Sequence, residues 1–223
     1  MLSDLITITH RYGQYLVIRQ KSDAAVDLPR VGESILQASL SWVEEVVATK
    51  TEICIKCSPS VTSEDIAQIT DLPLPQYEAS HYRLPVFFDG AEWQEVTAAT
   101  GLQRSVIIDI IVSTEFTYAM HGFLPGFMYL DGLPTALHCA RKQQPSTRPI
   151  SQAFALGGPY AGVYDLPSPS GWHVIGKLPI RIYDKGSSLA LRPGDRVRVE
   201  AITAVQYEEL QQRQLTLESY QLC

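Results

Sequence analysis

Two glycine-rich segments hold most of the residues that could bind or transform a small molecule. They are residues 121–132, HGFLPGFMYLDG, and residues 156–177, LGGPYAGVYDLPSPSGWHVIGK. Pro125 and Gly126 are the favoured central residues of a type II turn, which would bring the flanking phenylalanines to one end of the fold. Exposed backbone amides between aromatic walls would suit a small carboxylate, amide or heterocycle. Tight β-turns with aromatic side chains in the core would show the same residues, and both interpretations stay open.

Several other kinds of site do not fit the spacing of the residues. The histidines show neither HxH nor HExxH spacing, and no GxSxG nucleophile motif occurs. The stretch GWHVIGKL nearly matches a P-loop, but Leu178 offers no hydroxyl for magnesium and Pro179 follows where a helix is required. Cys54 and Cys57 form a CxxC on a predicted strand, where residues three apart point to opposite faces. We therefore expect buried or half-buried thiols in a reducing compartment and no metal site.

The composition narrows the class of protein further. The chain of 223 residues has a net charge of −6, and the sequence has 45% hydrophobic and 19% charged residues, as in ordinary globular proteins. This acidic balance does not favour nucleic acid or an anionic membrane as a partner. The longest apolar run, Val106–Val112, is interrupted by Asp109, and the start lacks a signal-peptide pattern. We expect a cytoplasmic protein.

The residues that precede position 80 predict a small α+β unit. Alternating residues around Gly13 indicate two strands, and TEICIKC indicates another. Apolar residues at 4-3-4 spacing predict a helix over residues 32–47, and Thr62 or Ser63 is the expected N-cap of a second helix. A proline-containing linker then leads into a strand. The predicted order over residues 1–80 is β-α-β-α-β.

The following residues predict short helices and a β-barrel. A short helix should end at Gly101, and residues 103–113 fit either a strand or a helix, of which we favour the helix. From Glu115 onward, short strand-like runs alternate with Gly, Pro and Ser turns, which is typical of a closed or nearly closed barrel. The tail from Ala204 predicts a short surface helix.

The ordered motifs also carry a family resemblance. GFLPGFMYLDGL, Arg141, GGPYAGVYDLPSPSGWHVIGK and LRPGDRVRV together resemble the family of allophanate hydrolase subunit 1, also known as the B subunit of 5-oxoprolinase, which includes sporulation-kinase inhibitor proteins. The resemblance implies an α+β fold, with a ferredoxin-like domain at 1–80 and a cyclophilin-like β-barrel domain at 81–223. It implies ATP-dependent hydrolysis of 5-oxoproline to glutamate, with ATP as the co-substrate, accompanied by magnesium, and with no tightly bound cofactor. It further implies subunits A and C as partners and no activity of the chain alone.

The same resemblance assigns candidate site residues. Arg141 is the expected contact to a phosphate or carboxylate, since a guanidinium binds two oxygens at once. His121, which flanks the first glycine-rich segment, and Lys177, which replaces a family arginine, complete the predicted catalytic set. The predicted substrate-binding residues are Gly122, Phe123, Pro125, Gly126, Phe127, Tyr164, Ser168, Pro169, Gly171 and Trp172.

The chain departs from the family pattern mainly at polar positions. The changed positions are Val112 for a histidine, Ser146 for an arginine, Gln152 and Ala153 for Gly-Ser, Ser170 for a glycine, and Leu178 for a threonine. One interpretation is an enzyme subunit, and the alternative is a regulatory binding protein that inhibits a sensor histidine kinase. A peptidyl-prolyl isomerase would rest on fold analogy alone.

Overall fold

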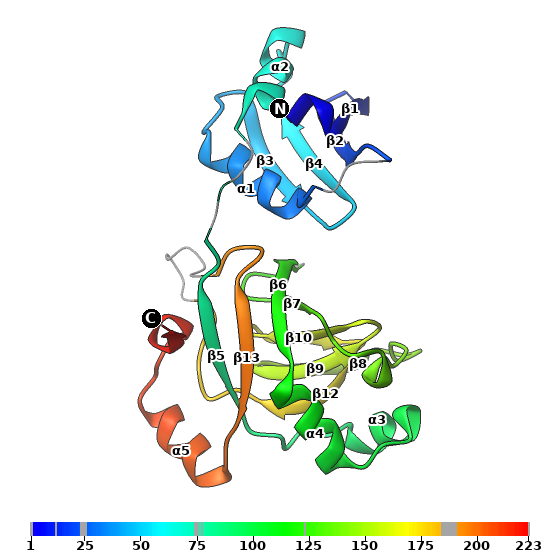
Figure 1. Ribbon diagram of the computed structural model, residues 1–223, viewed down its shortest axis with the longest axis vertical. Coiled ribbons are helices and arrows are strands. Elements are labelled where there is room, and N and C mark those ends of the chain that lie inside the picture. The colour runs from blue at the N-terminus through cyan, green and yellow to red at the C-terminus, as the bar shows by residue number, and fades with distance from the viewer. Residues whose placement is uncertain are drawn as a thin grey trace. The chain divides into compact units, whose positions relative to one another are not determined.

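The structure is a computed structural model in which contacts divide the chain into two units, Met1–Glu78 and Ala79–Cys223. Figure 1 shows the first unit in blue to cyan and the second in green to red. The described residues are 2–11, 13–22, 26–73, 76, 78–122, 124–183 and 191–222.

The first unit is a four-stranded antiparallel sheet with two α-helices. Its elements are η1 (Leu2–Asp4), β1 (Ile6–Arg11), β2 (Tyr15–Gln20), α1 (Leu28–Gln37), β3 (Val43–Ala48), β4 (Glu52–Cys57) and α2 (Ser63–Asp71). The strand order is β1-β2-β4-β3. The predicted β-α-β-α-β order is therefore wrong, because each helix follows a hairpin.

One face of this sheet forms the core of the first unit. Alternate residues of β2 and β4, such as Ile18, Ile53 and Ile55, are fully buried and pack with Ile35 of α1 and Ile69 of α2. Residues two apart on a strand share a face, so this alternation places both helices on the same side. Cys57 also lies on this face, whereas Cys54 is half-buried on the other, as predicted.

The predicted helix over residues 32–47 is wrong in its second half. The helix ends at Gln37, and Ser39 takes a left-handed φ of 49° that a continuing helix cannot accommodate. Val43–Ala48 is instead strand β3, in which Val47 pairs with Cys54. The β-branched valines favour an extended backbone, so their helical spacing does not decide the structure here.

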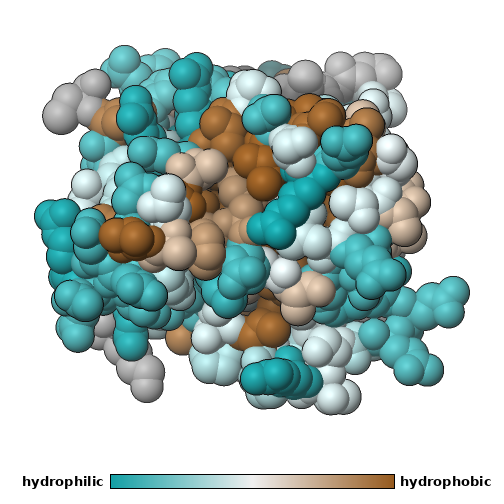
Figure 2. All heavy atoms as spheres, turned by 90° about the horizontal axis from the view of Figure 1, so that it is seen from below, coloured by the Kyte–Doolittle hydropathy of each residue, from teal (hydrophilic) through white to brown (hydrophobic). Residues whose placement is uncertain are grey.

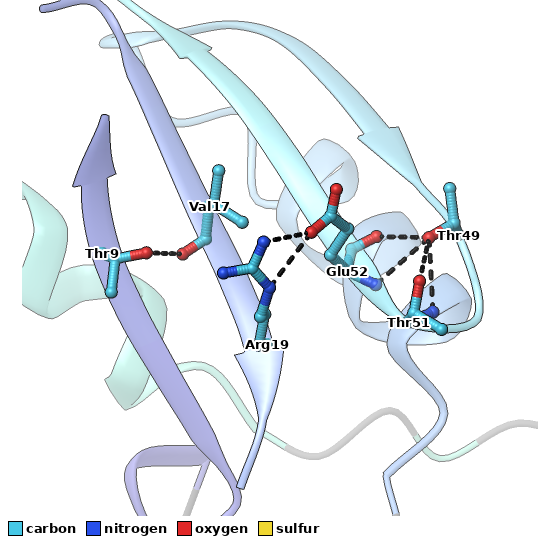
Figure 3. Close-up of polar contacts among 6 residues, drawn as sticks. All are labelled: Thr9, Val17, Arg19, Thr49, Thr51 and Glu52. Carbon is cyan, nitrogen blue, oxygen red and sulfur yellow. Dashed lines mark hydrogen bonds and ion pairs between the residues drawn. The ribbon is translucent and has the colours of Figure 1, made fainter. Parts of the chain in front are cut away.

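The opposite face of the sheet carries polar contacts between neighbouring strands (Figure 3). Arg19 on β2 donates through Nε and Nη2 to Glu52 Oε2 on β4, at 3.1 and 2.6 Å. Thr9 donates to the Val17 carbonyl at 3.3 Å, and Thr49 Oγ1 donates to the Glu52 carbonyl at 3.0 Å. Exposed ion pairs contribute only about 0–1 kcal/mol, so burial of the apolar face provides most of the stability.

The second unit contains an eight-stranded sheet and a two-stranded sheet. The eight-stranded order is β12-β9-β10-β7-β6-β13-β5-β14, and β11 pairs with β8. The elements are β5 (His81–Val86), α3 (Trp93–Thr100), α4 (Arg104–Ser113), β6 (Glu115–His121), β7 (Met128–Asp131), η2 (Thr135–Leu137), β8 (Ser146–Ile150), β9 (Ala153–Gly157), β10 (Tyr160–Tyr164), β11 (Ser168–Ser170), β12 (His173–Lys177), β13 (Arg196–Ala201), α5 (Ala204–Gln212), η3 (Leu217–Tyr220) and β14 (Gln221–Leu222).

We predicted a closed or nearly closed barrel, and the described strands do not form a closed one. The short strand β14 pairs with β5 through Gln221 and Tyr82, so it occupies the edge that a closing strand would need. After β5, Phe87 and Lys177 form an isolated bridge to β12, and the N–H groups of Gly90 and Glu92 donate to the Ile175 and Val174 carbonyls, each at 3.1 Å. These contacts bring the segment after β5 beside β12, but no continuous ladder of the described strands closes the sheet there.

The helices of the second unit follow the sequence more closely. Helix α3 ends at Gly101, whose φ of 70° is left-handed, and α4 is a helix with Ile107 and Ile111 buried. Helix α5 buries no residue, as expected of a surface helix. Seen from below, apolar side chains gather around a shallow hollow bordered by hydrophilic ones (Figure 2). No single helix of the described residues is long and apolar enough to span a membrane; α3 and α4 pass that test only as a pair bent by 85°.

Candidate aromatic and arginine site

The second unit carries an aromatic cluster on one face of its large sheet. Alternation along β7 places Met128 and Leu130 in the main core and Tyr129 on the opposite side. The same alternation applies along β9, β10 and β12. We define the aromatic cluster as Phe127, Tyr129, Tyr160, Tyr164 and Trp172.

The rings of the aromatic cluster meet edge to face. Phe127 lies 4.6 Å from Tyr164 and 5.6 Å from Trp172 between ring centroids, with interplanar angles of 88° and 86°. Tyr129 lies 5.4 Å from Trp172 and 5.5 Å from Tyr160. Each such pair stabilises the folded state by about 0.5–1.5 kcal/mol beyond the burial of apolar area, so the rings hold one another in fixed positions.

Glycines allow the rings to approach the backbone. A Cβ atom at Gly162 would meet Trp172 Cζ3 at 2.7 Å, and a Cβ at Gly157 would overlap the same indole. A Cβ at Gly122 would overlap Phe127. The glycine-rich segments therefore serve close packing of large aromatic side chains.

The predicted turn at Pro125–Gly126 is confirmed. The Phe127 N–H donates to the Leu124 carbonyl at 3.0 Å, and Gly126 has a φ of 78°. This turn inserts Phe127 into the aromatic cluster. Phe123, the other predicted phenylalanine, lies outside the described residues.

Arg141 contacts the aromatic cluster from the solvent side. Its Cζ atom lies 5.5 Å from the centroid of the Trp172 ring, within the range of a cation–π contact. Its side chain is exposed, and among the residues that the structure describes no hydrogen bond or ion pair engages its guanidinium. The N–H donors of Arg141 are thus available to an oxyanion.

Two buried serines lie on β11, and one of them, Ser170, contacts the aromatic cluster. The hydroxyl of Ser170 accepts from the Trp172 N–H at 3.1 Å and donates to the Trp172 carbonyl at 3.0 Å. Burial raises the pKa of Tyr164, while its hydrogen bond with Ser170 and the charge of Arg141 act in the opposite direction. Ser168 is also buried and donates to the Pro169 carbonyl at 3.1 Å. Ser170, a departure from the family pattern, is therefore built into this site.

The other predicted catalytic residues have different neighbours. His121 is exposed, and its Nδ1 shares a short hydrogen bond with the Tyr118 hydroxyl. Lys177 forms an exposed ion pair with Asp89 at 3.2 Å. The structure thus places Arg141, Phe127, Tyr164 and Trp172 together, with Gly122, Gly126, Ser168, Pro169 and Gly171 in the adjoining turns and strands.

Asp165 is a buried carboxylate beside the Pro125–Gly126 turn. Its Oδ1 and Oδ2 accept from the N–H groups of Ile182 and Tyr183 at 2.9 and 3.1 Å. Burial raises the pKa of Asp165, and the two backbone hydrogen bonds oppose this shift. Because a Cβ at Gly126 would lie 2.8 Å from Asp165 Cβ, the carboxylate side chain and the turn pack directly together.

The remaining family departures are mostly structural. Val112 is exposed on α4, Leu178 is fully buried, and Ala153 belongs to the core beneath the aromatic cluster. Gln152 takes a left-handed φ of 45°, and its Nε2 donates to the Ile180 carbonyl at 3.1 Å. Asp195, a family position, is also structural, since it is fully buried and accepts from the Ser80 N–H at 2.8 Å.

Four residues of this region were not predicted from the sequence. Tyr129 and Tyr160 follow the alternation of β7 and β10, so the period-two pattern held the necessary signal. Glu92 and Lys142, which form a half-buried ion pair, are far apart in the chain and no local pattern links them. Among the described residues, no group of three His, Cys, Asp or Glu side chains could hold a metal ion.

Comparison with known proteins places this chain in a family. A family model described as "Carboxyltransferase domain, subdomain C and D" matches residues 15–190. Proteins named as the B subunit of 5-oxoprolinase match from Escherichia coli O157:H7 (35% identity over 126 residues, 54% of this chain and 58% of that protein) and from Haemophilus influenzae (30% over 133 residues, 57% and 62%). The chain thus spans about three fifths of the length of these curated relatives.

A solved structure has a similar fold. The crystal structure of TTHA0988 matches with a TM-score of 0.76 and 26% identity, over 86% of this chain and 41% of that one. The match to the family model covers most of the chain, and the relatives named as the B subunit of 5-oxoprolinase agree with the predicted resemblance. The chain therefore belongs to the carboxyltransferase domain, subdomain C and D family, which is the family of allophanate hydrolase subunit 1 and of the B subunit of 5-oxoprolinase.

Proposed function

We propose that this chain is the B subunit of an ATP-dependent 5-oxoprolinase. The complex would convert 5-oxo-L-proline, ATP and water into L-glutamate, ADP and phosphate in the cytoplasm. Similarity to proteins named as the B subunit of 5-oxoprolinase supports this proposal. The name of these relatives denotes one subunit of several, and we propose subunits A and C as the partners without which this chain is inactive.

The observation that carries the proposal is the guanidinium of Arg141 over Trp172, which no hydrogen bond or ion pair engages within the described part of the chain. In the proposed reaction, the lactam oxygen accepts the γ-phosphoryl group of ATP and ADP leaves. Water then attacks the activated carbon, phosphate leaves and the ring C–N bond opens. Donors that face the phosphate or carboxylate oxygens stabilise this charge, and a guanidinium can bind two oxygens at once. The neighbouring rings of the aromatic cluster would exclude water from the apolar part of the substrate.

The finer fold assignment belongs to the same proposal. The antiparallel order β1-β2-β4-β3 with two helices on one face supports a ferredoxin-like first domain. The course of the large sheet, in which the segment after β5 returns to β12 at the Phe87–Lys177 bridge, supports a cyclophilin-like second domain. We propose that residues 1–80 and 81–223 are these two domains.

The test is release of phosphate from ATP by the chain co-purified with subunits A and C, with and without 5-oxoproline. We expect 5-oxoproline to stimulate release and Arg141→Ala to abolish the stimulation. The matched control is Arg198→Ala on β13, which removes an exposed ion pair with Glu115 on β6. A stable complex that 5-oxoproline does not stimulate would overturn the proposed reaction, and unchanged turnover by Arg141→Ala would remove Arg141 from the site.

A further inference from the structure

The backbone around Arg141 is held on both sides by hydrogen bonds. On its N-terminal side, the Ala140 carbonyl lies 3.0 Å from His173 Nε2. On its C-terminal side, the Lys142 N–H donates to the Gly171 carbonyl at 2.8 Å. These contacts fix the backbone position of Arg141 but not its side-chain rotamer. The rotamer therefore depends on the charges around the side chain.

The Glu92–Lys142 ion pair lies next to this segment and is largely withdrawn from water. The side chains of Lys142 and Glu92 are 15% and 18% exposed, whereas each other described ion pair has at least one side chain more than 40% exposed. The second oxygen of Glu92 accepts a short hydrogen bond from the Val174 N–H. Both carboxylate oxygens of Glu92 are therefore occupied.

The charges of Glu92 and Arg141 both lie near the aromatic cluster. Val174 and Trp172 lie on the same face of the sheet. The Val174 N–H donates to Glu92, and the Trp172 ring packs against Arg141. The charges of Glu92 and Arg141 both influence the Tyr164 phenol, with opposite effects on its pKa. A carboxylate that is partly buried and loses its cation leaves an uncompensated charge, and a guanidinium is well suited to neutralise it.

We propose that the Glu92–Lys142 ion pair keeps the Arg141 guanidinium unneutralised over Trp172, so that Glu92 and Lys142 are positioning residues for Arg141. Lys142 neutralises the Glu92 carboxylate, which would otherwise attract Arg141 away from the aromatic cluster. Glu92 in turn ties Lys142, and with it the Arg141 segment, to β12. This inference rests on the proposed function, in which the free donors of Arg141 bind an oxyanion of the substrate.

The test compares Lys142→Met with the double variant Glu92→Gln and Lys142→Met. In crystal structures of the full chain, we expect Arg141 to leave Trp172 and pair with Glu92 in Lys142→Met, and to remain over Trp172 in the double variant. In the complex with its partner subunits, kcat/KM for 5-oxoproline should fall about tenfold or more in Lys142→Met, the usual effect of losing a hydrogen bond to a charged group. The double variant should recover most of this loss.

A merely structural ion pair would give a different result. The double variant would then be impaired at least as much as Lys142→Met, and either this outcome or an unmoved Arg141 in Lys142→Met overturns the inference. Lys56→Met is the matched control, because it removes an exposed pair with Glu44 in the first unit and should leave Arg141 in place. If the wild-type complex does not hydrolyse 5-oxoproline but the crystal structures behave as expected, the proposed function fails and the positioning role stands.

Discussion

The Cζ3 atom of Trp172 lies so close to Gly162 that a Cβ atom added to this glycine would meet it at 2.7 Å. The same Cβ would lie 3.0 Å from the Met128 carbonyl oxygen, so the backbone behind it cannot give way. Gly162 therefore fixes how deeply the indole sits on β10. The Arg141 guanidinium packs over this indole, so Gly162 indirectly determines how far the guanidinium lies from the sheet.

We predict that Gly162→Ala lowers the free energy of unfolding by about 1–3 kcal/mol, the usual cost of overpacking a core. Urea denaturation followed by circular dichroism measures this change. Gly171→Ala is the control, because apart from its chain neighbours no described residue has an atom within 4 Å of its added Cβ, so its free energy of unfolding should hardly change. Equal stability of the two variants would contradict the tight contact between Gly162 and Trp172.

Arg141→Lys should separate the charge of Arg141 from its shape. Lysine keeps the positive charge but lacks the planar group that stacks on Trp172 and binds two oxygens. We expect kcat/KM of the assembled complex for 5-oxoproline to fall roughly ten- to hundredfold, corresponding to one charged hydrogen bond. The free energy of unfolding should stay unchanged, since the side chain is exposed. Full activity of Arg141→Lys would show that charge alone suffices.

The sequence predicted the elements whose local signals agree with one another. Helix α2 begins at Thr62, an expected N-cap, and α3 ends at Gly101, where a left-handed φ favours glycine. The helix predicted over residues 32–47 was wrong in part, because the apolar spacing favoured a helix and the β-branched residues favoured a strand. Pairing of β3 with β4 decided the outcome, and such pairing is a tertiary contact that a local pattern does not contain.

The candidate site was predictable only where it follows strand alternation or turn chemistry. The turn at Pro125–Gly126 and the gathering of aromatic residues could be read from their order. The Trp172–Arg141 contact and the Glu92–Lys142 ion pair form because the segments around Glu92 and Arg141 meet the start of β12 in the folded chain. Such tertiary contacts have no local sequence pattern. We predicted a closed or nearly closed barrel, and full closure was wrong for a related reason, because the pairing of β5 and of the segment after it is tertiary. A two-residue strand, β14, pairs with β5, and no continuous ladder of described residues joins the following segment to β12.

The buried Asp165 should make stability depend on pH in a definite direction. Burial raises the pKa of its carboxyl above the ordinary value of 3.8, with backbone hydrogen bonds from Ile182 and Tyr183 opposing the shift. Just above pH 3.8, the folded state therefore holds more protons than the unfolded state. The contribution of Asp165 to stability is present below that pH and is lost as pH rises through the raised pKa.

Comparison of the wild type with Asp165→Asn isolates this contribution. We expect the difference in free energy of unfolding, wild type minus variant, to decrease as pH rises from about 4 to 7. Urea denaturation at several pH values measures it, and the difference removes the effect of the other carboxylates. A difference that is constant or grows with pH would show that the backbone hydrogen bonds outweigh burial.

The last prediction concerns whether residues 1–80 and 81–223 fold independently. Thr62 Oγ1 accepts from the Asp65 N–H at 3.2 Å, and Asp65 Oδ2 accepts from the Thr62 N–H at 2.9 Å, which forms a capping box at the start of α2. Thr62→Ala should destabilise this helix by about 1 kcal/mol. Because α2 contributes Ile69 to the first core, the loss should reach the whole of that unit.

Hydrogen exchange of the full chain reads out each unit separately. With independent folding, Thr62→Ala lowers protection only in the first unit and Gly162→Ala only in the second. Thr203→Ala is the matched control, since it removes a similar capping box from α5, a helix that buries no residue, and should affect that helix alone. A loss of protection in both units from Thr62→Ala or Gly162→Ala would mean that they unfold as one cooperative body, because separate cores can transmit a change in stability only if their unfolding is coupled.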